Sequence, residues 1–254
     1  MNKIVPHEIN YKTINKISSC SSFLLLISAL ISLSILIIDK TNFIVSKETF
    51  NRNLNAALGI LAILYFLLDI VQNYLFQQAE LNRKNDFIDN SFETKLSEEN
   101  SQGYFSNDNF APSIYKLGVN GFENSFFTKN ISSKMIAPNI IKSAIILILF
   151  LLVIFYTDQS TLIALVQIAL PFTIIQQTIR LVIFHSHVNK VFDNYKHIFA
   201  NVAKTKRSPL IINNVINYEK TLSWGGIQLD SKLFNKHNPK LTLDWETLKA
   251  KYNI

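Results

Sequence analysis

TLIALVQIALPFTIIQQTIRLVIF, residues Thr161–Phe184, is the stretch that decides the fold. Its first 19 residues carry no charge, and a transmembrane helix needs roughly 20 mostly apolar residues. The stretch also carries a polar stripe, which covers an arc of about 100° on a helix and consists of Thr173, Gln176, Gln177 and Arg180. Because polar side chains that face lipid are expensive, this stripe is predicted to face another helix or water.

Three further apolar segments accompany it in a chain of 254 residues that is 48% hydrophobic. The four predicted spans are Ser18–Ile38, Leu54–Phe76, Ile136–Tyr156 and Thr161–Phe184. The first is too long for the apolar core of a signal peptide, so we interpret it as a retained anchor. The predicted fold class is an all-α membrane protein whose four transmembrane helices form two hairpins, with a helical cytosolic module made by the mid-chain insert and the C-terminal tail.

This reading divides the chain into five parts. They are a cytosolic N-terminal arm (1–17), a first transmembrane hairpin (18–76), a helical cytosolic insert (77–135), a second transmembrane hairpin (136–184) and a helical cytosolic tail (185–254). The arm, the insert and the segment after the fourth span hold fourteen Lys and Arg residues, against three in the other two loops. By the positive-inside rule, both termini are predicted to be cytoplasmic.

The net charge of +7 is then mostly close to the membrane, where it can serve anionic lipid. Direct nucleic-acid binding is not implied. Cys20 is the sole cysteine, which excludes a disulfide framework, and we expect it to be a small buried packing residue.

Polar side chains on the second span provide candidate pore or gate residues. Asp69, Gln72 and Asn73 share one helical face, as do Gln176, Gln177 and Arg180 on the fourth span. Asp69 and Arg180 lie at similar depths, and three interpretations stay open: a structural pair that holds the bundle closed, residues that line or gate a pore, or side chains that snorkel to the interface.

No motif argues for catalysis. The chain has no phosphate-binding glycine loop, no Gly-x-Ser-x-Gly and no His-Glu-x-x-His, so we expect no enzyme activity, no cofactor and no metal. Asp86, Asp89 and Glu93 share a helical face that could bind a cation, although a solvated face is the simpler interpretation.

The insert and tail are predicted to be helical, with breaks at particular residues. We expect one helix from about Leu54 to about Glu98, interruptions at Gly118 and Gly121, and breaks at Pro138 and Pro239. The two segments should share a core, because neither has enough apolar surface alone. That predicted core contains Ile88, Phe92, Leu96, Phe122, Phe126, Ile212, Leu222, Trp224 and Trp245.

Two short motifs carry a resemblance to a known family. The stretch Ile88-Asp89-Asn90-Ser91-Phe92-Glu93-Thr94 follows the second span, and Asn124-Ser125-Phe126-Phe127 precedes the third. With the two-hairpin layout, they resemble the four-transmembrane pore-forming effectors associated with SMODS nucleotidyltransferases and SLOG domains in bacterial anti-phage defence. A Leu-Pro-Trp-Asn stretch expected after the first motif is absent.

The resemblance implies a homo-oligomeric effector that permeabilises or depolarises the bacterial inner membrane. Its activator would be a nucleotide second messenger, such as a cyclic oligonucleotide, or a nucleotidyltransferase-linked partner. The residues implied in the cytosolic module are Phe92, Glu93, Asn124, Phe126, Phe127 and Trp224. Phe126, Phe127, Tyr104, Phe105 and Trp224 could stack on a nucleobase or be buried between insert and tail. A non-conducting scaffold or sensor that anchors a partner is the alternative function.

Overall fold

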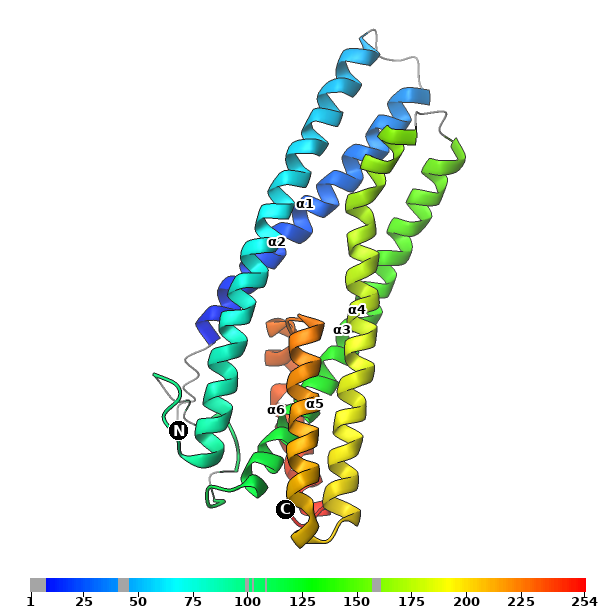
Figure 1. The fold of residues 1–254 in the computed structure, drawn as a ribbon. Helices are drawn as coiled ribbons and strands as arrows, with labels where there is room; N and C mark the ends of the chain where they lie inside the picture. Colours follow the sequence, from blue (N-terminus) through cyan, green and yellow to red (C-terminus); the bar gives the residue numbers. More distant parts are fainter. Residues whose placement is uncertain (1–7, 41–45, 99–100, 102, 108, 157–160) are drawn as a thin grey trace. The chain divides into compact units, whose positions relative to one another are not determined.

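The computed structural model describes residues 8–40, 46–98, 101, 103–107, 109–156 and 161–254. The chain is all-helical, with 87% of it in helices and no strand among the described residues. The helices are α1 (Glu8–Lys40), α2 (Lys47–Phe92), α3 (Ile114–Tyr156), α4 (Thr161–Asn201), the 3-10 helix η1 (Lys204–Lys206), α5 (Arg207–Gly225) and α6 (Ser231–Lys251) (Figure 1). The predicted all-α class is confirmed.

Three helices are long and apolar enough to cross a membrane. These candidate spans are Glu8–Ile35, Lys47–Phe92 and Ile114–Leu149. The fourth predicted span begins in α4, where the side chains of 161–171 lie outside the described residues, as does the predicted turn at 157–160. Four spans therefore stay a prediction, while three are supported by the structure.

Helix α2 begins and ends earlier than the sequence pattern predicts. It ends at Phe92 rather than near Glu98, because Glu93 adopts a positive φ of 56°. Carboxylate oxygens of Asp89 accept hydrogen bonds from the Leu96 and Ser97 amides at 2.8 and 2.7 Å, which turns the chain back against the helix end. Side-chain capping of this kind satisfies amides that a continuing helix would have paired internally.

Neither predicted proline break occurs. Pro138 lies inside α3 and Pro239 lies inside α6, which joins the two short tail helices expected from the sequence. A proline inside a helix removes one hydrogen bond and costs about 3 kcal/mol. In α6, residues on both sides of the proline pack on the core, with Leu233 and Phe234 before it and Leu241 and Trp245 after it. This burial outweighs the local cost.

Gly118 and Gly121 also fail to interrupt their helix. Both lie within α3, where their missing side chains let neighbouring helices approach closely. A Cβ atom at Gly121 would lie 2.2 Å from the Tyr195 hydroxyl, and one at Gly118 would lie 2.7 Å from Ile211 Cδ1. The expected turn at Gly225-Gly226 is present, because Gly226 caps α5 in the left-handed conformation.

The chain divides into two compact units. Unit 1 contains Met1–Asn15, Leu75–Met135 and Arg180–Ile254, and unit 2 contains Lys16–Tyr74 and Ile136–Ile179. Each of the four long helices α1 to α4 therefore contributes residues to both units.

Unit 1 is built around an aromatic core shared by insert and tail. Phe122 of α3 stacks on Phe199 of α4 with centroids 5.6 Å apart, and meets Trp245 of α6 edge-on at 5.3 Å. In Figure 1, α5 and α6 run beside the C-terminal part of α4, where these rings come together. Trp245 and Phe122 are completely buried, whereas Trp224, Leu96 and Ile212 are exposed. Their predicted place in the core is wrong, because Trp224 and Ile212 lie on the outward side of α5 and Leu96 lies in the loop after α2.

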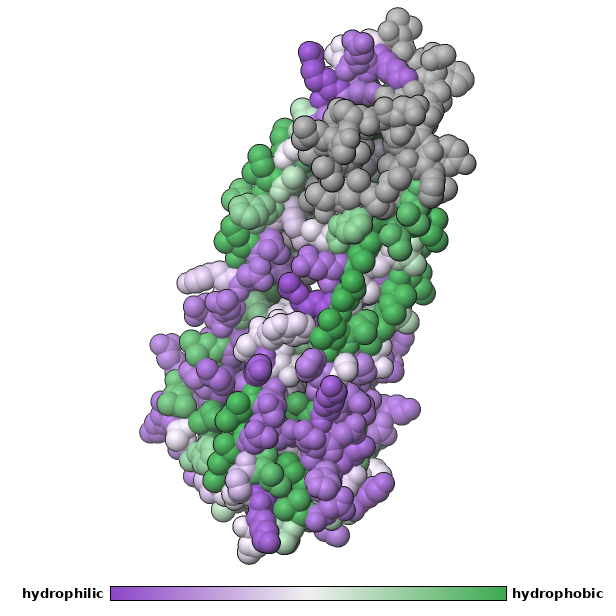
Figure 2. Space-filling model, turned by 45° about the vertical axis from the view of Figure 1, so that its right-hand side comes forward, coloured by the Kyte–Doolittle hydropathy of each residue, from purple (hydrophilic) through white to green (hydrophobic). Residues whose placement is uncertain are grey.

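Unit 2 has an apolar surface and few large buried side chains. Isoleucine and phenylalanine side chains of α2, such as Ile63 and Phe66, are more than half exposed. Figure 2 shows hydrophobic residues covering much of the drawn face of the unit 2 helices, whereas unit 1 carries many hydrophilic side chains on its surface. Cys20 is exposed rather than buried, because it lies on the outward face of α1.

Candidate functional site

Unit 1 contains a cavity of about 370 Å³ to which every α-helix contributes. Such a volume lies in the range of small-molecule sites, about 300–1,000 Å³. Its lining residues are Glu8, Tyr11 and Lys12 of α1, Glu80 and Arg83 of α2, Tyr104 of the loop before α3, Asn124, Phe127 and Thr128 of α3, Phe184 of α4, Tyr218 and Leu222 of α5, Ile227, Gln228 and Leu229 before α6, and Ser231, Phe234, Asn235 and Asn238 of α6.

Apolar and hydrogen-bonding groups line different parts of this cavity. Phe127 and Phe234 lie with ring centroids 6.1 Å apart, and Phe184 and Leu222 are buried behind them. Asn124, Asn235 and Asn238 contribute amide side chains, each able to donate and to accept hydrogen bonds. A mostly apolar pocket with a few polar groups is the usual composition of a small-molecule site.

A buried charge network lies at one side of the cavity. Arg83 Nη2 contacts Glu219 Oε2 at 2.6 Å, and Arg83 Nε contacts Glu80 Oε2 at 2.9 Å. Burial alone would lower the pKa of Arg83, but the carboxylates of Glu80 and Glu219 raise the pKa above its ordinary value. The Tyr11 hydroxyl donates to Glu80 at 2.5 Å, and burial followed by the Glu80 charge raises the pKa of Tyr11. The network joins α1, α2 and α5 through the Tyr11 hydroxyl and the Arg83 guanidinium.

The residues predicted for the cytosolic module separate in the structure. Asn124 and Phe127 line the cavity, and the neighbouring Phe126 is buried in the aromatic core. Phe92 packs half-buried against that core, while Glu93 lines a different pocket. Trp224 is 55% exposed, with its ring 6.0 Å from His187. Two of the six residues thus meet in one site.

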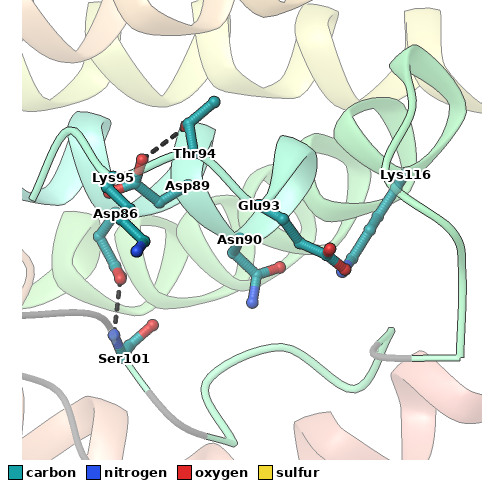
Figure 3. A pocket seen from close by; sticks show the side chains of 8 residues that line it. All are labelled: Asp86, Asp89, Asn90, Glu93, Thr94, Lys95, Ser101 and Lys116. Atoms are coloured by element: carbon teal, nitrogen blue, oxygen red, sulfur yellow. Dashed lines mark hydrogen bonds between the residues drawn. The ribbon is translucent and has the colours of Figure 1, made fainter.

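Glu93 belongs to an acidic pocket at the end of α2. Figure 3 shows this pocket, which has a volume of about 270 Å³ and is lined by Asp86, Asp89, Asn90, Glu93, Thr94, Lys95, Ser101 and Lys116. Asp86 and Asp89 are 3% and 2% exposed, so the solvated face expected from the sequence is wrong for these two residues, whereas Glu93 is exposed.

These carboxylates fix the loop that follows α2. The Ser101 amide donates to Asp86 at 2.7 Å, and Asp89 accepts from Thr94 at 2.6 Å as well as from two amides. Burial opposes ionisation of Asp89, but these hydrogen bonds outweigh it and lower its pKa. Within the described residues, no group of three or more His, Cys, Asp or Glu side chains is arranged to hold a metal ion.

A second buried polar cluster centres on Glu123 of α3. Asn107 Nδ2 donates to Glu123 Oε2 at 2.6 Å and to Asn120 Oδ1 at 3.0 Å. Burial raises the pKa of Glu123 to about 7, against the opposing effects of the Ser106 amide, Lys249 and Asn107. The cluster attaches the loop before α3 to the helices of unit 1.

The predicted pore or gate residues are described separately in the two units. In unit 2, Gln177 Nε2 donates to the Tyr65 hydroxyl at 3.2 Å, and Asn73 Nδ2 donates to Asp69 Oδ2 at 3.0 Å within α2. Gln176 is exposed and Gln72 is half-buried. Arg180 belongs to unit 1, where it is exposed. Their role in a pore stays a prediction.

Sequence reasoning missed most of the cavity. Arg83, Tyr218 and Phe234 come from three helices and no short motif joins them. One signal was present, because Glu80 and Arg83 are three residues apart and helical pairs at this spacing interact. The long-range partner Glu219, 136 residues away, has no such signal.

Comparison with known proteins found no match to this chain among family models, curated proteins or solved structures.

Proposed function

We propose that this protein is a membrane-embedded effector that permeabilises or depolarises the bacterial inner membrane when a ligand occupies the cavity of unit 1. The observation that supports this proposal is that one cavity is lined by residues of all six α-helices. Three of these helices also contain segments long and apolar enough to cross a membrane. If a ligand binds one arrangement of the unit 1 helices more tightly than another, it raises the population of that arrangement. Because the same helices continue into the apolar segments, the change can reach the membrane.

The conducting path in this proposal uses polar side chains of α2 and α4. They are Asp69, Gln72, Asn73, Gln176, Gln177 and Arg180. Polar groups inside a membrane generally face a bundle interior or a water-filled path, which favours a role in conduction for these residues. Several copies of the chain would assemble around the path, with both termini in the cytoplasm. The resemblance to anti-phage effectors supports the same assignment and implies a nucleotide second messenger or a partner protein as activator.

Dye entry into a bacterial host that produces the full chain tests this function. We expect propidium entry and loss of membrane potential with the unaltered chain. Asn124→Trp fills the cavity and should lower dye entry to the level of the empty vector, because no ligand can enter. Asn213→Trp makes the same change at an exposed position of α5 outside the cavity and should leave dye entry unchanged.

The outcomes separate the effector from a scaffold. A chain that is produced at normal levels without dye entry or depolarisation would contradict the effector and favour a non-conducting anchor. Equal dye entry in Asn124→Trp and Asn213→Trp would contradict control by the cavity. Asp69→Asn supplies a further check, because removal of a charge from a conducting path changes the cation-to-anion selectivity of planar-bilayer currents.

A further inference from the structure

Both cations that line the cavity already contact carboxylates. Lys12 Nζ lies 3.0 Å from Glu8 Oε1, and Arg83 contacts Glu80 and Glu219 at 2.9 and 2.6 Å. Among the described lining residues there is no further Lys or Arg. The Arg83 pairs are mostly buried, so a phosphate group that approached Arg83 would have to displace a carboxylate and leave its charge unpaired, whereas the Lys12–Glu8 pair is exposed to solvent.

The helix end at the cavity is also occupied. Ser231 of α6 lines the cavity, and a helix N-terminus would ordinarily attract an anion through its free amides. Here the Asp230 carboxylate accepts hydrogen bonds from the Lys232 and Leu233 amides at 2.7 and 2.9 Å. The charged residues that line the cavity, Glu8, Glu80, Lys12 and Arg83, sum to a formal charge of zero.

The remaining polar groups of the cavity are neutral. The side chains of Asn124, Asn235 and Asn238 make no hydrogen bond to another part of the chain that the structure describes. Amides of this kind pair with the donor and acceptor edge of a heterocycle. Phe127 and Phe234 line the same space, and aromatic rings of this kind stack on planar bases.

We propose that the cavity selects an uncharged planar heterocycle with hydrogen-bond donors, of nucleoside size, and rejects the phosphorylated forms of the same molecule. The inference rests on the proposed function, which makes the cavity the ligand site, and it names an uncharged nucleoside in place of the nucleotide messenger that the resemblance implies. The lining has no net positive charge to attract an anion, so a neutral ligand is favoured over a phosphorylated one. The rings and the free amides provide the contacts.

Binding to the purified full chain in detergent tests this selection. The probes are adenosine, guanosine, cytidine and uridine with their 5′-monophosphates, and the readout is isothermal titration calorimetry. We expect saturable binding of at least one nucleoside and affinity about tenfold or more weaker for its monophosphate, which corresponds to about 1.4 kcal/mol. Asn124→Ala should weaken nucleoside binding about tenfold, and Asn213→Ala should not change it. A monophosphate that binds as tightly as its nucleoside, or no binding of any nucleoside, overturns the proposal.

A change of charge at the cavity sharpens the test. Glu8→Gln leaves Lys12 unpaired at the lining and should strengthen monophosphate binding about fivefold or more, with nucleoside binding unchanged. Glu48→Gln removes the same charge from an exposed position in the first turn of α2 and should change neither affinity. Equal effects of the two variants would show that net charge, not the cavity, sets the preference.

Failure of this inference and failure of the proposed function give different results. If monophosphates bind best while Asn124→Trp still abolishes dye entry, the cavity controls the membrane and the ligand class is wrong. If nucleosides bind as expected while Asn124→Trp leaves dye entry intact, the ligand class is right and the cavity does not control permeability.

Discussion

Units 1 and 2 bury different kinds of side chains, although the same four long helices contribute to both. The core of unit 1 is aromatic and includes Trp245, Tyr195 and Phe122, whereas no aromatic side chain is buried among the described residues of unit 2. There the buried set includes Ser28, Ser32 and Thr178. Small and hydroxyl residues at helix contacts are typical of association in lipid, and large buried rings are typical of folding in water.

The hydrogen bonds of the two units differ in the same direction. In unit 2, the buried Ser28 and Ser32 donate to carbonyls of their own helix, Leu25 O at 2.8 Å and Ser28 O at 2.9 Å. Ser143 and Thr178 share a hydrogen bond of 2.6 Å between α3 and α4. Unit 1 holds charged groups, such as the Arg83 network, that need water or paired carboxylates nearby. The comparison indicates that the unit 2 part of each long helix is suited to lipid and the unit 1 part to water.

The largest effect is expected from a substitution in the aromatic core of unit 1. Trp245→Ala should destabilise unit 1 by about 3–5 kcal/mol, because a completely buried indole is lost and its bond to Ser106 Oγ is broken. Trp224→Ala, the only other tryptophan of the chain, is the matched control and should stay within about 0.5 kcal/mol. Thermal unfolding in detergent measures both. Equal losses would contradict the difference in burial.

The two tryptophans also show what sequence reasoning could and could not predict. Helix existence and the insert-to-tail pairing of Phe122 with Trp245 follow from the periodicity of the apolar residues. The outward position of Trp224 does not, because amphipathicity of α5 leaves several apolar residues exposed. Pro239 shows the same limit. Its local preference predicts a helix break, but α6 continues through it because residues on both sides pack on the core.

A second prediction compares one glycine from each unit. Gly121→Ala should destabilise unit 1 by about 1–3 kcal/mol, because the new methyl group would overlap the buried Tyr195 ring. Gly59→Ala in α2 of unit 2 meets no atom within 4 Å and should be neutral or stabilise the helix by up to about 1 kcal/mol. The unfolding midpoints of the two variants should therefore move in different directions. A stabilised Gly121→Ala would contradict the close approach of α3 and α4.

A third prediction uses the pH dependence of unit 1. The pKa of Glu123 is about 7 in the folded protein, against an ordinary value of 4.5. Between these values the folded chain holds a proton that the unfolded chain has released, so the contribution of Glu123 to stability is greatest below pH 4.5 and is lost as the pH rises to about 7.

Glu123→Gln removes this titration and keeps an acceptor for Asn107. At pH 8 the variant should be more stable than the unaltered chain by about 1–2 kcal/mol, and the difference should shrink toward pH 5. Lys249 and Glu246 of α6 also act on this carboxyl group, so Glu246→Gln serves as a control with a weaker pH effect. A stability difference that is constant from pH 5 to pH 8 would show that Glu123 does not titrate in this range.

The smallest expected effect concerns the interhelical hydrogen bond of unit 2. Gln177 donates to the Tyr65 hydroxyl at 3.2 Å, and double-mutant cycles on such bonds in membrane proteins average about 0.6 kcal/mol. Tyr65→Phe and Gln177→Leu should each cost less than about 1 kcal/mol, and the double variant should cost less than their sum by about 0.6 kcal/mol. Since water at the same site would satisfy each group after loss of its partner, a coupling energy of zero would indicate that Tyr65 and Gln177 face an aqueous path. A positive coupling energy would indicate a dry contact between α2 and α4, so this small number also separates a sealed helix interface from a conducting one.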